Sequence, residues 1–241
     1  MKALIFDCDG VLVDTERDGH RVAFNKAFKQ MEIREEWSVN LYKELLRVAG
    51  GKERIRHYFN MNGWPLKYSD KDLLIKVLHK LKTEIFMELI SSGALPLRSG
   101  VARLIDEAIK ENIKLAVCST SNEKAVNTII EKLLGPERKK KFNVILAGDV
   151  VSKKKPDPGI YNLAIEKLNV NPKECIVVED SRNGLLAANA AGLKCIITTN
   201  GYTENENFSE ADLAVNELGD FPNIRVNLDK LKKITSYHFD N

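Results

Sequence analysis

Short apolar runs alternate with amphipathic stretches over much of the chain. A run of four or so apolar residues, bounded by polar or turn-forming residues, is typical of a strand that is buried on both faces. The stretches between the later runs repeat their apolar residues at helical spacing. Strands that alternate with helices predict an α/β domain whose parallel, Rossmann-like sheet is covered on both faces. The expected strands are residues 3–6, 115–118, 144–147, 175–178, 195–197 and 213–215.

The segment from residue 16 to residue 91 contains helical patterns and no convincing strand. We therefore expect two domains, a sheet domain at 1–15 and 92–241 and a helical domain at 16–91 inserted after the first strand. Gly50 and Gly51 interrupt the pattern of the insertion. Its helices are expected at 18–31, 37–48, 53–61 and 70–91. The last helix is expected to bury Leu73, Leu74, Val77, Leu78, Leu81, Ile85 and Leu89 on one side.

Capping signals indicate where helices of the sheet domain begin. The spacing from Thr120 to Glu123 is that of a capping box, so a helix is expected from there toward residue 134. Pro158 suits the first position of a helix that Asp157 caps. A further helix is expected at 101–111, and another after residue 181 with small residues on one face. A short closing helix is expected beyond residue 223.

The composition is that of an ordinary globular protein. The chain has 241 residues, of which 44% are hydrophobic and 29% charged, and its net charge is +3. So slight a charge gives no reason to expect binding to nucleic acid or to a membrane. No apolar stretch approaches the roughly 20 residues that span a bilayer. The basic runs at 138–141 and 153–155 are expected on solvated surface, apart from the lysine before Pro156.

The four cysteines are expected to be buried, reduced thiols. Cys8, Cys118, Cys175 and Cys195 each lie within or beside an expected strand, and no C-x-x-C pair occurs. This pattern favours reduced thiols, as in a cytosolic type of compartment, over disulfides or a metal site formed by cysteines.

Candidate chemistry begins where the first strand ends. Two carboxylates one residue apart, Asp7 and Asp9, follow the apolar run, and Gly10 lets the backbone turn away. Parallel sheets bind ligands just outside the carboxyl ends of their strands. Two acids at that place are costly to desolvate unless a cation neutralises them, and oxygen ligands suit Mg²⁺. Taken alone, the motif is equally consistent with a polar turn after a core strand.

Three other segments end in groups of matching chemistry. The second strand leads into Ser119 and the loop 120–122, Lys155 directly precedes Pro156, and the fourth strand leads into Glu179 and Asp180. Asp, Ser/Thr, Lys and an acidic pair, in this order on successive α/β units, resemble the four motifs of the haloacid dehalogenase-like (HAD) superfamily. The resemblance spans nearly the whole chain. It implies the HAD fold with a helical cap of the C1 type at 16–91.

The resemblance also implies an aspartyl-phosphate mechanism. Asp7 is the expected nucleophile, ionised at neutral pH without special tuning, and Asp9 the expected general acid and base. Ser119 and the backbone N–H of Thr120 are expected to hold phosphate oxygens, with Ser121 and Asn122 beside them. Lys155 is expected to balance charge between the phosphate and Asp7.

The implied cofactor is Mg²⁺. Its expected ligands are Asp7, the backbone carbonyl of Asp9, and Asp180, with Glu179 close by or linked through water. The acids at 179 and 180 are also expected to cap the helix that follows, and both roles are compatible.

Substrate selection is expected from the cap. Gly51, Lys52 and Arg54 form a candidate substrate loop, for which an ordinary helix start with solvated charges is the alternative. Glu16 and His20 are placed to meet hydroxyl groups of a polyol, although a single histidine is as often structural. Arg98 in the second linker is assigned to a distal phosphate.

Within the superfamily, Asp9 disfavours haloacid dehalogenases and phosphonatases, which lack an acid there. A phosphatase and a mutase of the β-phosphoglucomutase type remain. The segments 50–54, 118–126 and 153–162 resemble CbbY-type proteins, which implies hydrolysis of xylulose-1,5-bisphosphate, an inhibitory by-product of Rubisco. Two other classes are alternatives: a phospho-Asp receiver domain, although receiver domains lack such a helical insertion, and an inactive relative kept for binding, which the four intact motifs disfavour. We expect a monomer, located in the plastid stroma if the chain comes from a photosynthetic eukaryote and otherwise in the cytoplasm. No targeting segment is expected ahead of the first strand, which starts almost at residue 1.

Overall fold

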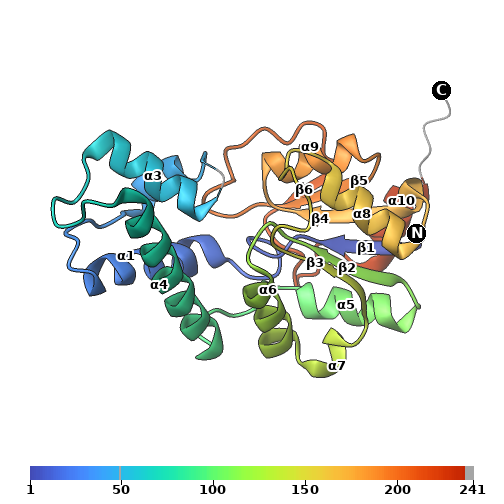
Figure 1. Cartoon of the computed structure of the whole chain (residues 1–241). Coiled ribbons are helices and arrows are strands. Elements are labelled where there is room, and N and C mark those ends of the chain that lie inside the picture. Colours follow the sequence, from blue (N-terminus) through green and yellow to red (C-terminus); the bar gives the residue numbers. More distant parts are fainter. Residues whose placement is uncertain (49, 237–241) are drawn as a thin grey trace. The chain divides into compact units, whose positions relative to one another are not determined.

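The computed structural model describes residues 1–48 and 50–236. The chain divides into two compact units (Figure 1), which we call the core unit (Met1–Asp14 and Pro96–Asn241) and the cap unit (Thr15–Leu95). The core unit carries all of the sheet, and the described part of the cap unit is helical.

The core unit is built on a six-stranded parallel sheet with the order β3-β2-β1-β4-β5-β6. All four residues of β1 are fully buried, which explains why its sequence is continuously apolar. The chain progresses outward from β1 in both directions, so the crevice at the carboxyl end of β1 is a topological switch point where ligands bind. The strands are β1 (Ala3–Phe6), β2 (Lys114–Cys118), β3 (Phe142–Leu146), β4 (Cys175–Glu179), β5 (Lys194–Thr198) and β6 (Leu213–Val215).

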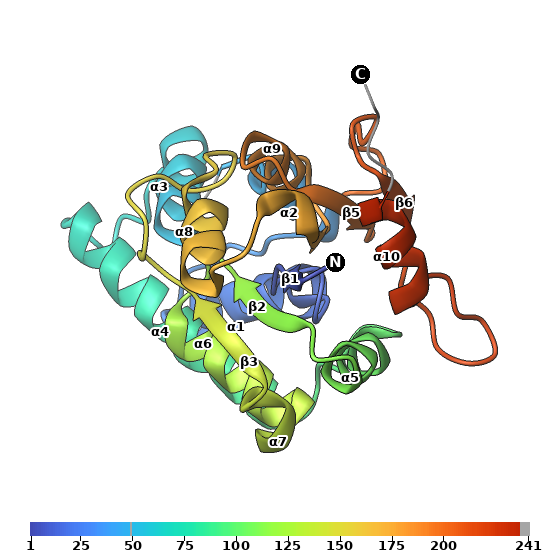
Figure 2. The same cartoon turned by 90° about the vertical axis from the view of Figure 1, so that its right-hand side faces the viewer.

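Helices cover both faces of this sheet (Figure 2). Helices α8 and α9 pack on the face that carries Ala3 and Ile5, while α5 and α10 lie on the other. Small residues of α9, including Ala187 and Ala188, allow that helix to approach the strands closely. The helical elements of the core unit are α5 (Val101–Lys110), α6 (Glu123–Ile129), η2 (Ile130–Leu134), α7 (Pro136–Lys139), α8 (Gly159–Leu168), η3 (Pro172–Glu174), α9 (Arg182–Ala190) and α10 (Leu228–Ser236).

The cap unit packs its helices around an aromatic interior. Phe24 and Phe28 of α1 contact Trp37, whose ring is also within 5.9 Å of the Tyr42 ring. These four side chains are fully buried. The elements of this unit are η1 (Glu16–His20), α1 (Arg21–Gln30), α2 (Val39–Leu45), α3 (Gly51–Asn62) and α4 (Lys71–Ser91).

The predicted α/β fold class is confirmed, and several local expectations are wrong in detail. Leu73 and Val77 are 55% and 43% exposed, because the buried stripe of α4 includes Lys82 instead. The ammonium of Lys82 packs over the rings of Phe24 and Phe86, at 4.9 and 5.2 Å, a contact that a search for apolar residues misses.

Two predicted helix caps also differ. Asn122, and not Thr120, caps α6, since its Oδ1 accepts from the N–H groups of Lys124 and Ala125. Ser181, and not the preceding acids, caps α9 through the N–H of Gly184. The short helix α7 was not predicted from the sequence. The closing helix, expected beyond residue 223, begins at Leu228.

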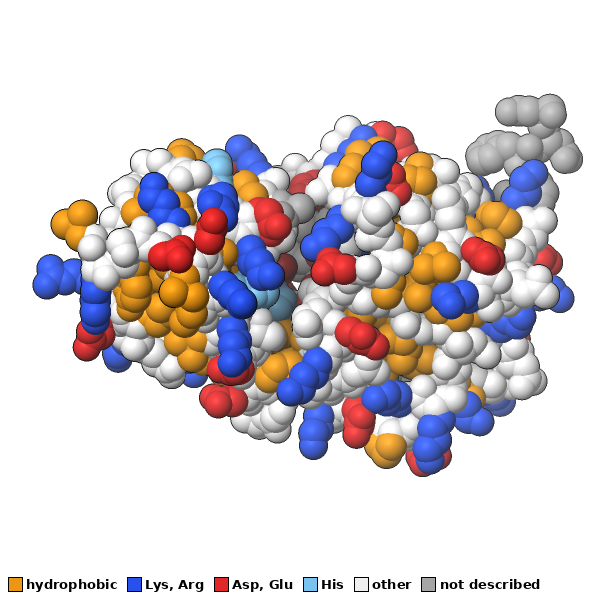
Figure 3. Space-filling view, in the orientation of Figure 1, with side chains coloured by type: hydrophobic (Ala, Val, Ile, Leu, Met, Phe, Trp, Pro, Cys, Tyr) orange, Lys and Arg blue, Asp and Glu red, His pale blue; other side chains and the backbone are white. Residues whose placement is uncertain are grey.

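The distribution of surface charge agrees with the modest net charge, and the cysteines agree with the expectation of buried thiols. Basic and acidic side chains are interspersed on the face shown in Figure 3, without one continuous basic field. Cys8, Cys118, Cys175 and Cys195 are buried and free, as expected. Among the described residues, no helix is both long and apolar enough to span a bilayer.

Candidate active site

Strand register gathers the predicted acids at one edge of the sheet. Phe6 of β1 pairs with Val117 of β2 on one side and with Val178 of β4 on the other. The residues that follow these three, Asp7, Cys118 and Glu179, therefore lie at one level. The N–H of Asp7 donates to the carbonyl of Val178 at 2.9 Å, which continues the ladder to the first candidate acid.

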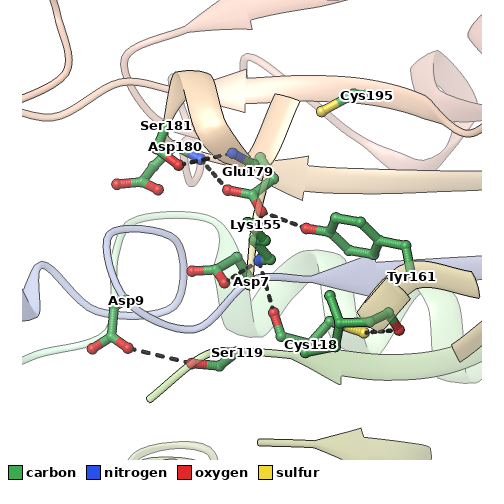
Figure 4. Close-up of polar contacts among 12 residues, drawn as sticks. Asp7, Asp9, Cys118, Ser119, Lys155, Tyr161, Glu179, Asp180, Ser181 and Cys195 are labelled. Atoms are coloured by element: carbon green, nitrogen blue, oxygen red, sulfur yellow. Dashed lines mark hydrogen bonds and ion pairs between the residues drawn. The ribbon is translucent and has the colours of Figure 1, made fainter. Parts of the chain in front are cut away.

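Lys155 connects the groups of this edge (Figure 4). Its Nζ donates to Asp7 Oδ1 and to Glu179 Oε1, both at 2.6 Å, and to the carbonyl of Cys118 at 3.0 Å. The side chain is 8% exposed, and its ammonium lies 4.9 Å from the centre of the Tyr161 ring. Three acceptors match the three protons of an ammonium, so this lysine is held in one orientation.

The cluster contains more buried negative groups than this one cation can balance. Asp7, Glu179 and Asp180 are buried and offer oxygens that all lie within 4.8 Å of one another. Burial, opposed by Lys155 and reinforced by the neighbouring acids, raises the pKa of Asp7 to about 8. Burial and the charges of Glu179 and Asp7 raise the pKa of Asp180 well above its usual range.

These shifts correct the expectation that Asp7 ionises without special tuning. They also fit a bound divalent cation, which would favour the ionised form of crowded carboxylates. Burial lowers the pKa of Lys155, but Asp7 and Glu179 outweigh it and raise the pKa above its usual value. Lys155 is therefore charged at neutral pH.

Glu179 is the most fully enclosed of the three acids. Its Oε1 accepts hydrogen bonds from Lys155 and from the hydroxyl of Tyr161, and its Oε2 accepts from the N–H of Asp180 at 3.1 Å. A Cβ at Gly184 would lie 2.0–2.2 Å from its carboxylate. The protein therefore already satisfies both oxygens, and Glu179 is better suited to holding Lys155 than to binding a metal directly.

Asp9 faces the loop that follows β2. Its Oδ2 accepts hydrogen bonds from the hydroxyl of Ser121 and, at 3.4 Å, from that of Ser119. Ser119 is 1% exposed, and its Oγ also accepts from the N–H of Ser121 at 3.0 Å. The chain bends at Cys8, so Asp7 and Asp9 are not alternate positions on one face of an extended strand.

Thr120 is half-buried in this loop, whereas Asn122 is exposed and its Oδ1 caps α6. The predicted phosphate-binding segment thus stands directly before a helix start.

In the cap unit, Arg54 has a different environment from the one expected. It is 7% exposed, and its guanidinium donates to the carbonyls of Leu45 and Val48 and to the hydroxyl of Tyr42. The Tyr42 hydroxyl in turn donates to Glu16 Oε2 at 2.7 Å. Arg54 therefore supports the candidate substrate loop and the orientation of Glu16 from inside the unit, whereas Lys52 is exposed and Gly51 half-buried at the start of α3.

His20 and Lys82 form a buried pair in the same unit. Nζ of Lys82 lies 2.9 Å from Nδ1 of His20, and both side chains are 7% exposed. Burial, together with Lys82 and Lys52, lowers the pKa of the nearby His79 to about 4. Lys82 therefore lies beside the candidate residue His20 in the interior of the cap unit.

Arg98 also differs from its expected contact with a distal phosphate. Its Nη1 donates to the carbonyl of Gly10 and, at 3.1 Å, to that of Thr198. Its Nη2 donates to the carbonyls of Thr199 and Asn216, each at 2.6 Å. Both terminal nitrogens are thus engaged with backbone at the ends of strands, because the linker re-enters the core unit beside them.

Three residues near the candidate groups were not expected to matter. Tyr161 is a buried residue of α8, and a tyrosine among aliphatic residues signals a buried hydroxyl that needs a partner. Asn200 follows β5 and donates to Asp180, so the rule that polar groups at strand ends form sites would have found it. Lys82 carries no sequence signal, since an isolated lysine in a helix is usually solvated.

A haloacid dehalogenase-like hydrolase family model matches residues 1–192. The chain belongs to this family. A CBBY-like protein of Arabidopsis thaliana is 56% identical over 230 residues, which cover 94% of this chain and 72% of the relative. CbbY of Cereibacter sphaeroides is 41% identical over 212 residues, 88% of this chain and 90% of that protein.

A crystal structure of CbbY from Rhodobacter sphaeroides in complex with phosphate matches with a TM-score of 0.85 and 38% identity, covering 96% of this chain and 99% of that one. A variant of that protein in complex with xylulose-(1,5)bisphosphate matches with the same values. The predicted membership of the HAD superfamily, and within it the likeness to CbbY-type proteins, is confirmed, so the chain is a hydrolase of this family.

Proposed function

We propose that this protein is a Mg²⁺-dependent phosphatase that converts xylulose-1,5-bisphosphate to xylulose 5-phosphate and inorganic phosphate. The observation that carries the proposal is Asp7 at the carboxyl end of β1, held by Lys155 at 2.6 Å within a buried acidic cluster. The likeness to CbbY, including its complex with xylulose-(1,5)bisphosphate, supports the choice of substrate.

Asp7 would act as the nucleophile. One of its carboxylate oxygens forms a bond to phosphorus while the bond from phosphorus to the sugar oxygen breaks. Asp9, in its protonated form, transfers its proton to the departing sugar oxygen. A water molecule then attacks the phosphorus of the aspartyl-phosphate, Asp9 takes up a proton from that water, and inorganic phosphate leaves with the Asp7 carboxylate restored.

Asp7, Asp180 and the backbone carbonyl of Asp9 are the groups proposed to hold Mg²⁺, with Glu179 behind them. When bound, the ion would supply positive charge that reduces the repulsion between the phosphate and the attacking carboxylate. Lys155 supplies a second positive charge at the same place. Ser119 and the N–H of Thr120 are proposed to hold phosphate oxygens at the start of α6, with Ser121 positioning Asp9.

The cap unit is proposed to select the sugar. Glu16 and His20 would contact hydroxyl groups, and Lys52 with the backbone at Gly51 would meet the phosphate that is not transferred. Arg54 would contribute indirectly, by fixing Tyr42 and hence Glu16.

The decisive measurement is phosphate release from a panel of sugar phosphates with and without Mg²⁺. We expect one phosphate per molecule of xylulose-1,5-bisphosphate, with kcat/KM at least about 10²-fold above that for xylulose 5-phosphate or ribulose-1,5-bisphosphate. Conversion of β-glucose 1-phosphate to glucose 6-phosphate, without phosphate release from pentulose bisphosphates, would establish a mutase instead. Labelling by an aryl phosphate that stops after one turnover would indicate a receiver-like protein.

The oligomeric state and the cellular location can be tested independently of the activity. A monomer is proposed and would be tested by light scattering of the purified protein. The similarity to the plant CBBY-like protein supports a plastid location. Tagging the protein in its native cell and imaging it would test that location.

A further inference from the structure

Asn200 holds the carboxylate of Asp180 in one orientation. Its Nδ2 donates to Asp180 Oδ2 at 2.7 Å, and both residues are buried. The N–H groups of Tyr202 and Thr203 donate to Asn200 Oδ1 at 2.9 and 3.3 Å. Because these two donors fix which end of the amide carries oxygen, the NH₂ group must face Asp180.

The turn after β1 closes against the same carboxylate. Gly10 has φ +81°, and a Cβ built on it would lie 1.9 Å from Asp180 Oδ2 and 3.0 Å from Asn200 Nδ2. Only glycine fits this position without displacing the acid. The backbone that carries Asp9 is thus in contact with Asp180 and Asn200.

Arg98 fastens these segments to one another. Its two terminal nitrogens donate to four carbonyls: that of Gly10 after β1, those of Thr198 and Thr199 at the end of β5, and that of Asn216 after β6. The strand that ends at Thr198 leads directly to Asn200. Arg98 therefore fixes both the turn at Gly10 and the loop that presents Asn200.

We propose that Asn200 and Arg98 are positioning residues for the metal site. Asn200 orients Asp180 directly, and Arg98 holds the turn at Gly10 and the Asn200 loop in register. The inference rests on the proposed metal site and adds two residues to which the sequence assigned no such role. Outer partners that orient a metal-binding carboxylate change metal affinity by about 10–100-fold when they are removed.

The variants Asn200→Ala and Arg98→Lys test the proposal in the full-length protein. Lysine keeps the positive charge of Arg98 but lacks the planar fork that spans several carbonyls. Mn²⁺ binding to each folded protein, followed by electron paramagnetic resonance of the free ion, reports metal affinity without reference to turnover. The Mg²⁺ concentration for half-maximal phosphatase activity is measured in parallel, and thermal unfolding shows how much each variant retains its fold.

The chain offers matched controls. Arg103→Lys removes a guanidinium that also binds several carbonyls, those of Gly219, Leu218 and Val226, away from the acidic cluster. Asn171→Ala removes an amide that accepts from the N–H of Lys173 before the opposite end of β4.

We expect Asn200→Ala to weaken Mn²⁺ binding by about 10–100-fold and Arg98→Lys by about 10-fold, with both controls within twofold of the unmodified protein. The proposal is overturned if Asn200→Ala, correctly folded, binds Mn²⁺ as tightly as the unmodified protein; the proposed function would then still stand. If the unmodified protein binds no Mn²⁺ and needs no Mg²⁺, both the inference and the proposed metal dependence fail. Equal weakening in Arg98→Lys and Arg103→Lys also overturns the role of Arg98, because general destabilisation would explain it.

Discussion

The two units satisfy their buried charges in different ways. In the core unit, three carboxylates lie close together, and the ammonium of Lys155 pairs with two of them, Asp7 and Glu179. In the cap unit, Arg54 donates to two carbonyls and a tyrosine hydroxyl, and Lys82 lies beside a histidine and over two aromatic rings. Burying a charge is costly unless it is paired or hydrogen-bonded, so both arrangements need a physical explanation.

The difference indicates that the buried charges of the core unit serve catalysis, whereas the buried Arg54 of the cap unit serves structure. The core cluster has an excess of acid that its own residues do not neutralise, and this is the condition for recruiting a divalent cation and then a phosphate. The buried guanidinium of Arg54 is satisfied by the fold itself, so it stiffens the unit and orients Glu16. The predictions that follow test this division, beginning with the largest expected effect.

Replacing Asp7 by Asn should abolish phosphate release, with a loss of about 10⁴-fold or more, because an amide oxygen cannot form the aspartyl-phosphate. The measurement is the initial rate at saturating substrate and Mg²⁺, with circular dichroism to confirm folding. Asp149→Asn is the matched control, since that side chain is 90% exposed and paired only at the surface with Lys154. Activity of Asp7→Asn within tenfold of the unmodified protein would rule out covalent catalysis at this residue.

Replacing Lys155 by Met should lower both activity and stability. Removing one partner of a buried ion pair leaves charges uncompensated and typically costs about 3–5 kcal/mol. We expect that loss in the free energy of unfolding, measured with urea in the absence of Mg²⁺, and a fall in kcat of about 10²-fold.

Lys154→Met controls for the change of residue type, because the neighbouring lysine is 41% exposed. It should behave like the unmodified protein. If Lys155→Met is as stable as Lys154→Met, the acids of the core cluster are not held by this lysine, and the contrast between the units fails.

The sequence could indicate the acids of the core unit because strand ends announce them. Asp7 and Glu179 each come at the end of an apolar run, and the parallel register then brings them to one level without further information. Helix α4 could be bounded nearly to the residue for a similar reason, because Asp70 caps it through the N–H of Leu73.

The cap unit could not be predicted equally well, because its polar contacts are not periodic. The sequence around Arg54 does not reveal whether its guanidinium points outward to a phosphate or inward to the carbonyl of Leu45. Likewise, nothing local distinguishes a solvated Lys82 from one buried on Phe86. These choices depend on which backbone groups the fold leaves without partners, and only the three-dimensional structure shows them.

Two buried tyrosines allow a direct comparison of the units. Tyr161 donates to Glu179 in the core unit, and Tyr42 donates to Glu16 in the cap unit. Each change to Phe should lower the free energy of unfolding by about 1–3 kcal/mol, because a hydrogen bond to a charged group is lost. We expect Tyr161→Phe to lower kcat, through Glu179 and Lys155, and Tyr42→Phe to raise KM, through Glu16. Steady-state kinetics would contradict the division if both variants changed the same parameter.

The smallest expected effect concerns His79, whose pKa falls from 6.5 to about 4 through burial and the charges of Lys82 and Lys52. Because the unfolded chain takes up this proton first as pH falls, His79 should reduce the stability of the protein between about pH 6.5 and pH 4. A shift of this size corresponds to about 3 kcal/mol at full burial, which we discount to about 1 kcal/mol because the ring is partly exposed. The free energy of unfolding of His79→Gln, measured with urea, should therefore rise by about 1 kcal/mol relative to that of the unmodified protein when the pH is lowered from 7 to 4.5. His57→Gln, on the exposed side of α3, is the control and should show no such rise in the free energy of unfolding. An equal rise in both variants would mean that the interior of the cap unit tolerates one more positive charge.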